Sequence, residues 1–284
     1  MELIVIGAGP AYTDRRGAAG ASFLVREGGA AVLLDLGQGA FPNLASTLEP
    51  SLLAAVVVSH LHPDHFIDLI PLRHYLRYEF DPPRRVRVVG PAGLADRLDA
   101  LHGRLGFAAI SLDVAPLEPG LQRIGPFTVE ARRVVHTDES YALRVSVADS
   151  VAPGVAADSA VGSAPGSTGA VPGAVPGAVP GAATGAAPGL VYSGDCGRGD
   201  DLVPLIRPGD TLLCEASFGA GTVPHGAEHL TAADAARAAA AGHAARLLLT
   251  HIQMGFDRGE ALAAAQSAFA GPVQLITEGD RFEL

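Results

Sequence analysis

The segment Ser59-His60-Leu61-His62-Pro63-Asp64-His65 places three imidazoles and one carboxylate within six residues. It follows an apolar run, Leu52 to Val58, that predicts a buried strand. Three more candidate ligands each end or follow a short apolar stretch further along the chain: His136, Asp195 and His251. Imidazoles combined with carboxylates, and no cysteine among them, suit zinc or a similar borderline divalent metal. The sequence therefore predicts a metal site.

The local geometry of the histidine cluster is compatible with two adjacent metals. His60 and His62 are two residues apart at a predicted strand end, so their side chains can lie on one side of the backbone. Pro63 can begin a helix, because the first helical turn does not need its missing N–H. Asp64 and His65 then fall on that first turn and can point back at the same cavity. One strand-to-helix junction can therefore offer ligands to two adjacent metals.

The cluster matches the His-x-His-x-Asp-His signature, and the later ligands follow in the matching order, so the chain resembles the metallo-β-lactamase superfamily over nearly all of its length outside 150–189. The resemblance implies two divalent metal ions, with zinc expected and manganese or iron as alternatives. It also implies that Asp35, in Asp35-Leu36-Gly37, supports the histidine loop from behind. The implied ligands are His60, His62 and His136 for the first metal, Asp64, His65 and His251 for the second, and Asp195 bridging both.

The chain is also similar to the ribonuclease Z-like branch, in which a strand ending in Glu-Ala-Thr is followed by a loop histidine. Here Glu215-Ala216-Ser217 precedes His229-Leu230-Thr231. The similarity implies that His229 donates a proton near the metals, that Glu215 orients it, and that Asp64 also orients the attacking hydroxide. His225 is a competing donor in the same loop. Alternatively, His229 is only a helix-start residue beside a Thr231 cap.

Two metals can clamp both the attacking and the leaving oxygen of a displacement, and a proton donor serves the leaving alkoxide of a phosphodiester. We therefore expect a phosphodiesterase for small substrates such as 3′,5′-cyclic nucleotides. The alternatives are a tRNA 3′-processing endonuclease and a lactone, thioester or sulfate-ester hydrolase of the same superfamily. A non-catalytic metal-binding or interaction protein is the hypothesis of a different class. A redox diiron site is disfavoured, because that branch carries glutamate where this chain has His62.

The charge balance disfavours a nucleic-acid substrate. The net charge is −10, lysine is absent, and the densest basic patch is Arg84-Arg85-Val86-Arg87. Proteins that bind long polyanions usually carry basic stripes, because neutralised phosphates supply most of the affinity. The nuclease branch often inserts a basic arm between the histidine and the aspartate that correspond to His136 and Asp195, but 150–189 contains no arginine. We expect a small-molecule phosphodiester as the partner.

The strands expected to position the candidate ligands are short apolar runs in both halves of the chain. Each half alternates strands with helices, which predicts an α/β fold: an αββα sandwich of two mixed sheets flanked by helices. The Val-Pro-Gly-Ala repeats within 150–189 are interpreted as a disordered insertion in a single domain spanning 1–284. The expected strands are 3–6, 21–26, 31–36, 56–58, 87–89, 121–124, 127–135, 141–147, 190–193, 211–215, 245–250 and 273–276, and the expected helices are 66–78, 92–105, 231–241 and 259–269.

Three further features concern cofactors, compartment and assembly. Val5-Ile6-Gly7-Ala8-Gly9 mimics a dinucleotide-binding opening, but no helix follows, so we expect a glycine loop leaving an edge strand and no nucleotide cofactor.

No apolar run reaches the roughly 18–20 residues of a membrane span, and no signal peptide is evident. Two cysteines make no disulfide framework. A cytoplasmic protein is therefore expected. The aromatics Phe66, Tyr75, Tyr78 and Phe80 could line a homodimer interface or the core.

Overall fold

The computed structural model describes residues 1–147 and 187–284, which fall in one compact unit. These residues form two seven-stranded mixed sheets. In the first sheet the strand order is β14 (Arg281–Glu283), β1 (Glu2–Gly7), β2 (Ser22–Glu27), β3 (Ala30–Leu34), β4 (Ala55–Val57), β5 (Val86–Gly90) and β6 (Leu112–Pro116). In the second it is β13 (Val273–Leu275), β12 (Arg246–Thr250), β11 (Thr211–Glu215), β10 (Leu190–Tyr192), β9 (Ser140–Val147), β8 (Phe127–Val134) and β7 (Gly120–Ile124).

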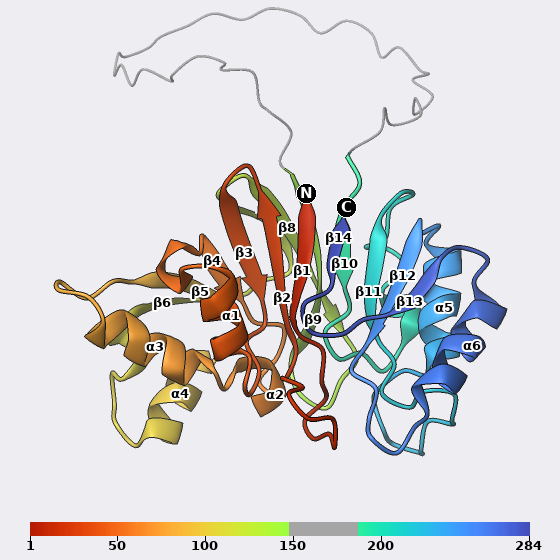
Figure 1. The fold of residues 1–284 in the computed structure, drawn as a ribbon, viewed down its shortest axis with the longest axis horizontal. Helices are drawn as coiled ribbons and strands as arrows, with labels where there is room; N and C mark the ends of the chain where they lie inside the picture. Colours follow the sequence, from red (N-terminus) through yellow and green to blue (C-terminus); the bar gives the residue numbers. More distant parts are fainter. Residues whose placement is uncertain (148–186) are drawn as a thin grey trace, which may run out of the picture. The chain divides into compact units, whose positions relative to one another are not determined.

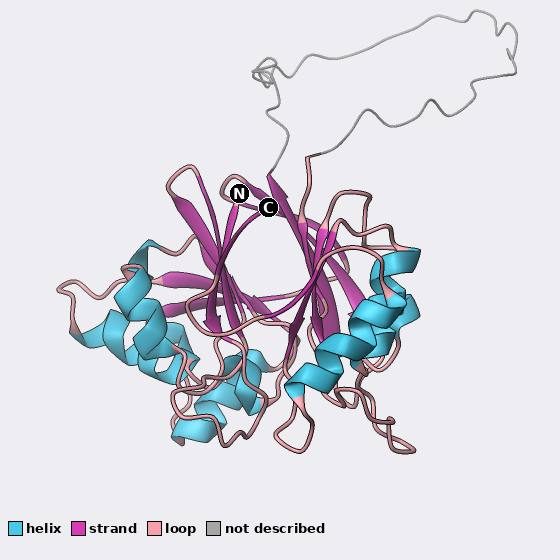
Figure 2. Cartoon of the chain, turned by 45° about the vertical axis from the view of Figure 1, so that its right-hand side comes forward, coloured by secondary structure: helices cyan, strands magenta, loops and turns pink. Residues whose placement is uncertain are grey.

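Helices cover the outer face of each sheet (Figures 1 and 2). The first sheet is covered by α1 (Phe41–Thr47), α3 (Leu69–Tyr78) and α4 (Leu94–His102), and the short α2 (Pro63–Phe66) carries part of the histidine cluster. The second sheet is covered by α5 (Ala232–Ala241) and α6 (Arg258–Ala268). This arrangement confirms the predicted αββα sandwich.

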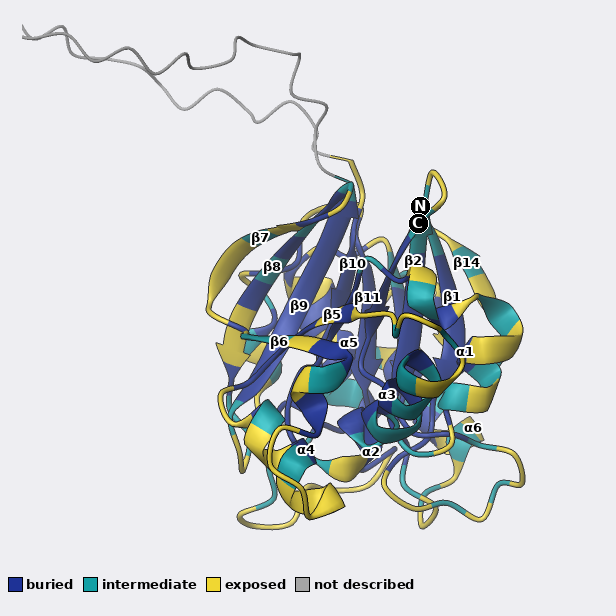
Figure 3. Cartoon of the chain, turned by 90° about the vertical axis from the view of Figure 1, so that its left-hand side faces the viewer, coloured by how far each residue is buried: buried dark blue, intermediate teal, exposed yellow. Residues whose placement is uncertain are grey.

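The period-2 alternation of the strands sorts side chains between three apolar layers. In β1, Leu3 and Val5 pack between the two sheets, whereas Ile4 and Ile6 pack under the helices of the first sheet. A third layer lies between α5, α6 and the second sheet. Figure 3 shows the central strands buried and the exposed residues concentrated on outer helix faces, on loops and on the edge strand β7. Burial on both faces explains why the sequence of these strands reads as apolar runs.

Several elements differ from the sequence expectations. The helix expected over 66–78 is interrupted, because the backbone N–H of Asp68 donates to Leu36 O rather than continuing α2. Helix α1 was not expected; its first N–H, on Phe41, is satisfied by the Asp68 carboxylate, 27 residues away. Strands β6 and β14 were also not expected, and because β14 pairs with β1, the prediction that β1 is an edge strand was wrong.

The glycines of the dinucleotide-like segment serve close packing between two loops. A Cβ on Gly7 would lie 1.9 Å from Gly20 O, and a Cβ on Gly9 would lie 2.8 Å from Ala19 O. Between them, Ala8 O accepts a hydrogen bond from the backbone N–H of His251 at 3.3 Å. The glycine loop therefore supports a candidate metal ligand.

The structure bears only in part on three expectations: the insertion, the homodimer and the absence of a membrane span. Residues 148–186, which contain most of the expected insertion, lie outside the described residues, so the single-domain organisation stays a prediction. Phe66 is 1% exposed and belongs to the core, whereas Tyr78 is 68% exposed; the homodimer also stays a prediction. Within 1–147 and 187–284, every helix is too short or too polar to cross a lipid bilayer.

Candidate active site

The candidate residues meet because parallel strands end at a common edge. Strands β3 and β4 are parallel neighbours, and β10, β11 and β12 form a parallel set. Asp35 and the histidine cluster follow the first pair, and Asp195, Glu215 and His251 end or follow the strands of the second set. The two halves of the chain therefore contribute to one site from facing sheets.

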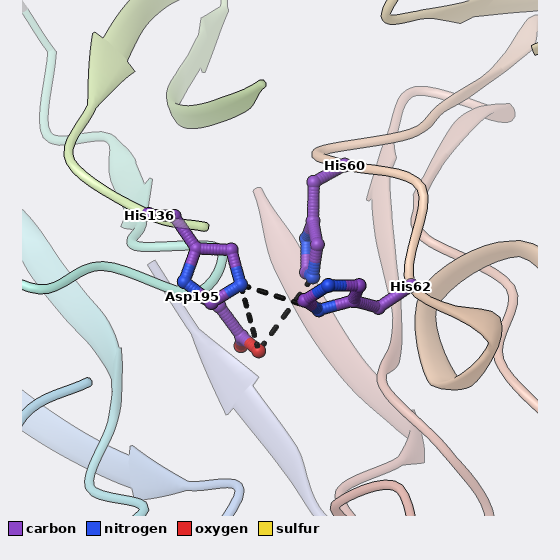
Figure 4. A group of neighbouring side chains, drawn as sticks. All are labelled: His60, His62, His136 and Asp195. Atoms are coloured by element: carbon purple, nitrogen blue, oxygen red, sulfur yellow. Dashed lines mark hydrogen bonds and ion pairs between the residues drawn. The ribbon is translucent and has the colours of Figure 1, made fainter. Parts of the chain in front are cut away.

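Four of the predicted ligands form one group: His60, His62, His136 and Asp195. Their ligand atoms all lie within 4.8 Å of one another, and Figure 4 shows the four side chains pointing toward a common centre. His62 Nδ1 is 3.2 Å from His136 Nε2, and His60 Nε2 is 3.6 Å from Asp195 Oδ2. A bond from His136 Nδ1 to the backbone carbonyl of Glu228, 2.9 Å long, directs the other ring nitrogen of His136 to the centre.

The other three predicted ligands form a second group beside the first. His251 Nε2 is 3.0 Å from Asp64 Oδ2 and 3.4 Å from His65 Nε2. Asp195 Oδ1 is 3.3 Å from His65 Nε2 and 3.7 Å from His251 Nε2. One oxygen of Asp195 thus faces each group, which is the arrangement that a bridging carboxylate requires.

The donor set fits a pair of divalent cations. His60 Nε2 and Asp195 Oδ1 are buried and form no well-aligned hydrogen bond within the described residues, a state that is costly for buried polar atoms unless a ligand satisfies them. Burial, together with the charge on His65, holds the pKa of His60 well below its usual value, so its imidazole is neutral. Burial raises the pKa of Asp195, but the charges on His251 and His65 outweigh burial and hold this pKa well below its usual value. The carboxylate is therefore ionised. The neutral imidazole of His60 and the ionised carboxylate of Asp195 are therefore in the forms that metal ligands need. Burial lowers the pKa of His65 and of His251, but nearby carboxylates outweigh it and raise both, so a metal bound there would displace their protons.

Asp35 holds the histidine cluster from behind, as expected from the Asp-x-Gly turn. Its Oδ1 accepts the backbone N–H of Ser59 at 2.6 Å. Its Oδ2 accepts the hydroxyls of Ser59 and Tyr192 at 2.7 and 2.6 Å and contacts His65 Nδ1 at 2.7 Å. Because Nδ1 of His65 is engaged, its Nε2 is left for the centre.

His229 lies at the margin of the two groups and is held by Glu215. Its Nδ1 is 3.0 Å from Glu215 Oε1 and 3.8 Å from Asp195 Oδ2. Burial lowers the pKa of His229, but its hydrogen bond and charge interaction with Glu215 outweigh this and raise the pKa to about 9. The competing His225 is exposed on the same loop and belongs to none of the clusters found among the described residues.

Sequence reasoning missed two hydroxyls and one carboxylate that contact these groups. Ser217 Oγ donates to Glu215 Oε2 at 2.5 Å and contacts His251 Nδ1 at 3.0 Å. Tyr192 reaches Asp35 across 157 residues of sequence. Asp138, at the rim, places its carboxylate 3.6 Å from His62 Nε2. Of these three residues, only Ser217 lies in a recognised sequence motif, the strand end Glu215-Ala216-Ser217. The contacts of Tyr192 and Asp138 depend on which chain segments the fold brings together.

Comparisons with known proteins agree with the fold. The sequence model of the beta-lactamase superfamily domain matches residues 31–252. An uncharacterized protein of Mycobacterium leprae is 29% identical over 89% of this chain and 78% of its own length. A ribonuclease Z of Salinispora arenicola is 31% identical over 98% of this chain and 94% of its own.

A solved structure has the same fold. The metallo-β-lactamase fold protein YhfI from Bacillus subtilis superposes with a TM-score of 0.77 at 21% identity, covering 99% of this chain and 98% of that one. The family match spans most of the chain and includes all seven candidate ligands. The chain therefore belongs to the metallo-β-lactamase superfamily of metallo-hydrolases.

Proposed function

We propose that this hydrolase is a dinuclear phosphodiesterase that acts on small substrates such as 3′,5′-cyclic nucleotides. The observation that carries the proposal is the pairing of His229 with Glu215 at 3.0 Å beside both ligand groups. A histidine held in the charged state at neutral pH is a proton donor. The alkoxide leaving group of a phosphodiester needs such a donor more than an activated lactam does.

The two ligand groups would hold one divalent metal each. The first metal would bind His60, His62 and His136, the second Asp64, His65 and His251, and Asp195 would contact both. Bound metals would supply Lewis acidity and a water nucleophile that forms near neutral pH. We propose zinc, because imidazole and carboxylate donors suit it, with manganese or iron as alternatives.

The proton transfer is assigned to the outer nitrogen of His229. A charged imidazole carries a proton on each ring nitrogen. The Nδ1–H donates to Glu215 Oε1, whereas Nε2 has no hydrogen-bond partner among the described residues and is free to donate. His229 would therefore protonate the leaving oxygen while Glu215 fixes the ring plane. Asp64 would orient the attacking oxygen from the opposite group.

A tRNA 3′-processing endonuclease is the second candidate, favoured by the 31% identity to the Salinispora ribonuclease Z. Against it stand the net charge of −10, the absence of lysine, and a stretch from 150 to 189 without a single arginine. Binding a long polyanion depends on neutralising several phosphates. A precursor tRNA with a 3′ trailer, incubated with the metal-loaded protein, should remain uncut. Specific cleavage at the trailer would make this candidate the primary function.

A comparison of leaving groups tests the proposal. We expect the wild-type protein to hydrolyse both 3′,5′-cyclic AMP and bis(4-nitrophenyl) phosphate. The variant His229→Ala should lose at least about 100-fold in kcat on cyclic AMP. It should lose much less on the nitrophenyl ester, whose leaving group departs without a proton. Equal losses on both substrates would contradict the proton-donor role, and no hydrolysis of either by the wild type would contradict the proposal itself.

A further inference from the structure

A cleft of about 560 Å³ opens beside His229, between the loop that follows Asp195 and helix α5. Its lining includes His229 itself, Gly197 and Gly199 from the loop, and Ala238 and Ala241 from the helix. This volume is in the range of pockets that hold small organic ligands. The cleft therefore begins at the residue to which we assign proton donation.

Small residues shape the walls of the cleft. A Cβ on Gly197 would lie 3.0 Å from the Cα of Glu228, and a Cβ on Gly199 would lie 3.4 Å from the Cβ of Ala238. The glycines therefore let the loop approach its neighbours closely. Val223 and Leu230 add apolar surface near His229. The resulting surface is therefore partly apolar.

One cation of the cleft is available to a ligand. Arg237 pairs with Asp234 across one helical turn. Arg198 is exposed, and its guanidinium has neither an ion-pair nor a hydrogen-bond partner within 1–147 and 187–284. A planar guanidinium stacks well on the face of an aromatic ring or a nucleobase.

We propose that the cleft binds the nucleoside portion of the substrate, with the base against Arg198 and the 3′-oxygen directed at His229. This inference rests on the phosphodiesterase proposal and extends it to the leaving-group side. Hydrolysis adds water across the P–O3′ bond: the hydroxyl goes to phosphorus, the bond to O3′ breaks, and His229 delivers its proton to O3′. The other proton of the water passes to solvent, and His229 regains a proton from solvent. Because the ring phosphate remains attached through O5′, the product is a nucleoside 5′-monophosphate.

Two neighbouring alanines provide a matched pair of variants. Ala240 and Ala241 are both exposed in the last turn of α5, but only Ala241 lines the cleft. Ala241→Trp should fill the cleft, and Ala240→Trp adds the same side chain outside it. We would titrate adenosine into the metal-loaded protein by calorimetry. Adenosine should bind the wild type with a Kd below about 1 mM, at least about tenfold more weakly to Ala241→Trp, and with little change to Ala240→Trp.

The role of Arg198 is tested in the same assay. Arg198→Ala should weaken adenosine binding by about tenfold, the loss expected for a stacked cation. Adenosine binding that Ala241→Trp leaves unchanged, or no binding by the wild type at 5 mM adenosine, roughly five times the Kd limit set above, would overturn the assignment of the cleft.

Cyclic AMP turnover separates this inference from the function on which it rests. An unchanged KM for cyclic AMP in Ala241→Trp would reject the cleft and leave the phosphodiesterase standing. Adenosine binding that depends on Ala241, in a protein that hydrolyses no cyclic nucleotide, would support the cleft and reject the phosphodiesterase.

Discussion

At the scale of single residues, the candidate ligands, their order and the support from Asp35 were predictable, but the side chains that hold Asp35 were not. His60 to His65 form a local motif, and motif spacing is visible in sequence. Asp195 could be assigned as a bridge only through resemblance to a family; the structure shows its two oxygens facing different ligand groups. Ser59 and Tyr192, which meet on Asp35, carry no spacing signal. Such contacts depend on how distant strands come together.

Replacing Asp35 should weaken metal binding without removing a ligand. Asp35→Asn keeps the shape but loses the charge that orients His65, so zinc affinity should fall by about 10- to 100-fold. Competition with a chromophoric chelator measures it. The control is Asp138→Asn, which changes an exposed carboxylate 3.6 Å from His62 and should have a much smaller effect. Equal losses in both variants would show that Asp35 has no special role.

At the scale of elements, hydrophobic periodicity predicted the buried strands and the long helices. It failed where an element depends on a distant partner. Helix α1 begins where the Asp68 carboxylate accepts the N–H of Phe41, and β14 has only one apolar residue, Phe282, in a three-residue pairing with β1. Neither has enough local pattern to be recognised.

The buried ion pair between β9 and the turn before β11 should contribute more to the free energy of unfolding than an exposed ion pair does. Arg144 and Asp210 are 2% and 0% exposed and form two bonds of 2.7 and 2.8 Å. Arg144→Ala leaves a buried carboxylate without its cation, which should lower the free energy of unfolding by about 3–5 kcal/mol. Arg207→Ala, which breaks the more exposed pair with Glu130, should cost under about 1 kcal/mol. Urea unfolding measures both, and comparable costs would contradict the assignment.

The cap of α5 gives a pH-dependent prediction. Burial raises the pKa of Asp234, but hydrogen bonds from Thr231 outweigh it and leave the pKa below its usual value. The stabilisation is therefore present above the unfolded pKa of about 3.9 and is lost as pH falls through the lower folded pKa. Thr231→Ala should cost about 1 kcal/mol at pH 7 and less at pH 2.5. A cost that does not shrink in acid would contradict the reciprocal capping bonds.

At the scale of the whole molecule, the site exists only when both halves of the chain are folded together. His60 and His65 come from the first sheet, and Asp195 and His251 come from the second. Periodicity could predict two comparable layers, but not which strand ends would face one another. The overall charge of −10 was visible in the sequence and bears on the substrate class.

Because the candidate ligands come from both sheets, metal binding should stabilise the whole unit. Removal of metal with a chelator should lower Tm, and zinc should restore it. Zinc at 100 times its Kd would contribute about 2.7 kcal/mol per site. Calorimetric scans of the wild type and Asp195→Ala measure the effect, which should be smaller in the variant. A Tm that does not respond to zinc in the wild type would contradict a site shared between the sheets.

The most direct test is the hydrolysis of 3′,5′-cyclic AMP by protein whose bound metal has been counted, with Asp64→Ala as the control for contaminating activity. We predict about two metals per chain, formation of 5′-AMP, and a loss of at least about 100-fold in the variant. Two bound metals without turnover, or turnover that survives in Asp64→Ala, would contradict the proposal that this site is a phosphodiesterase.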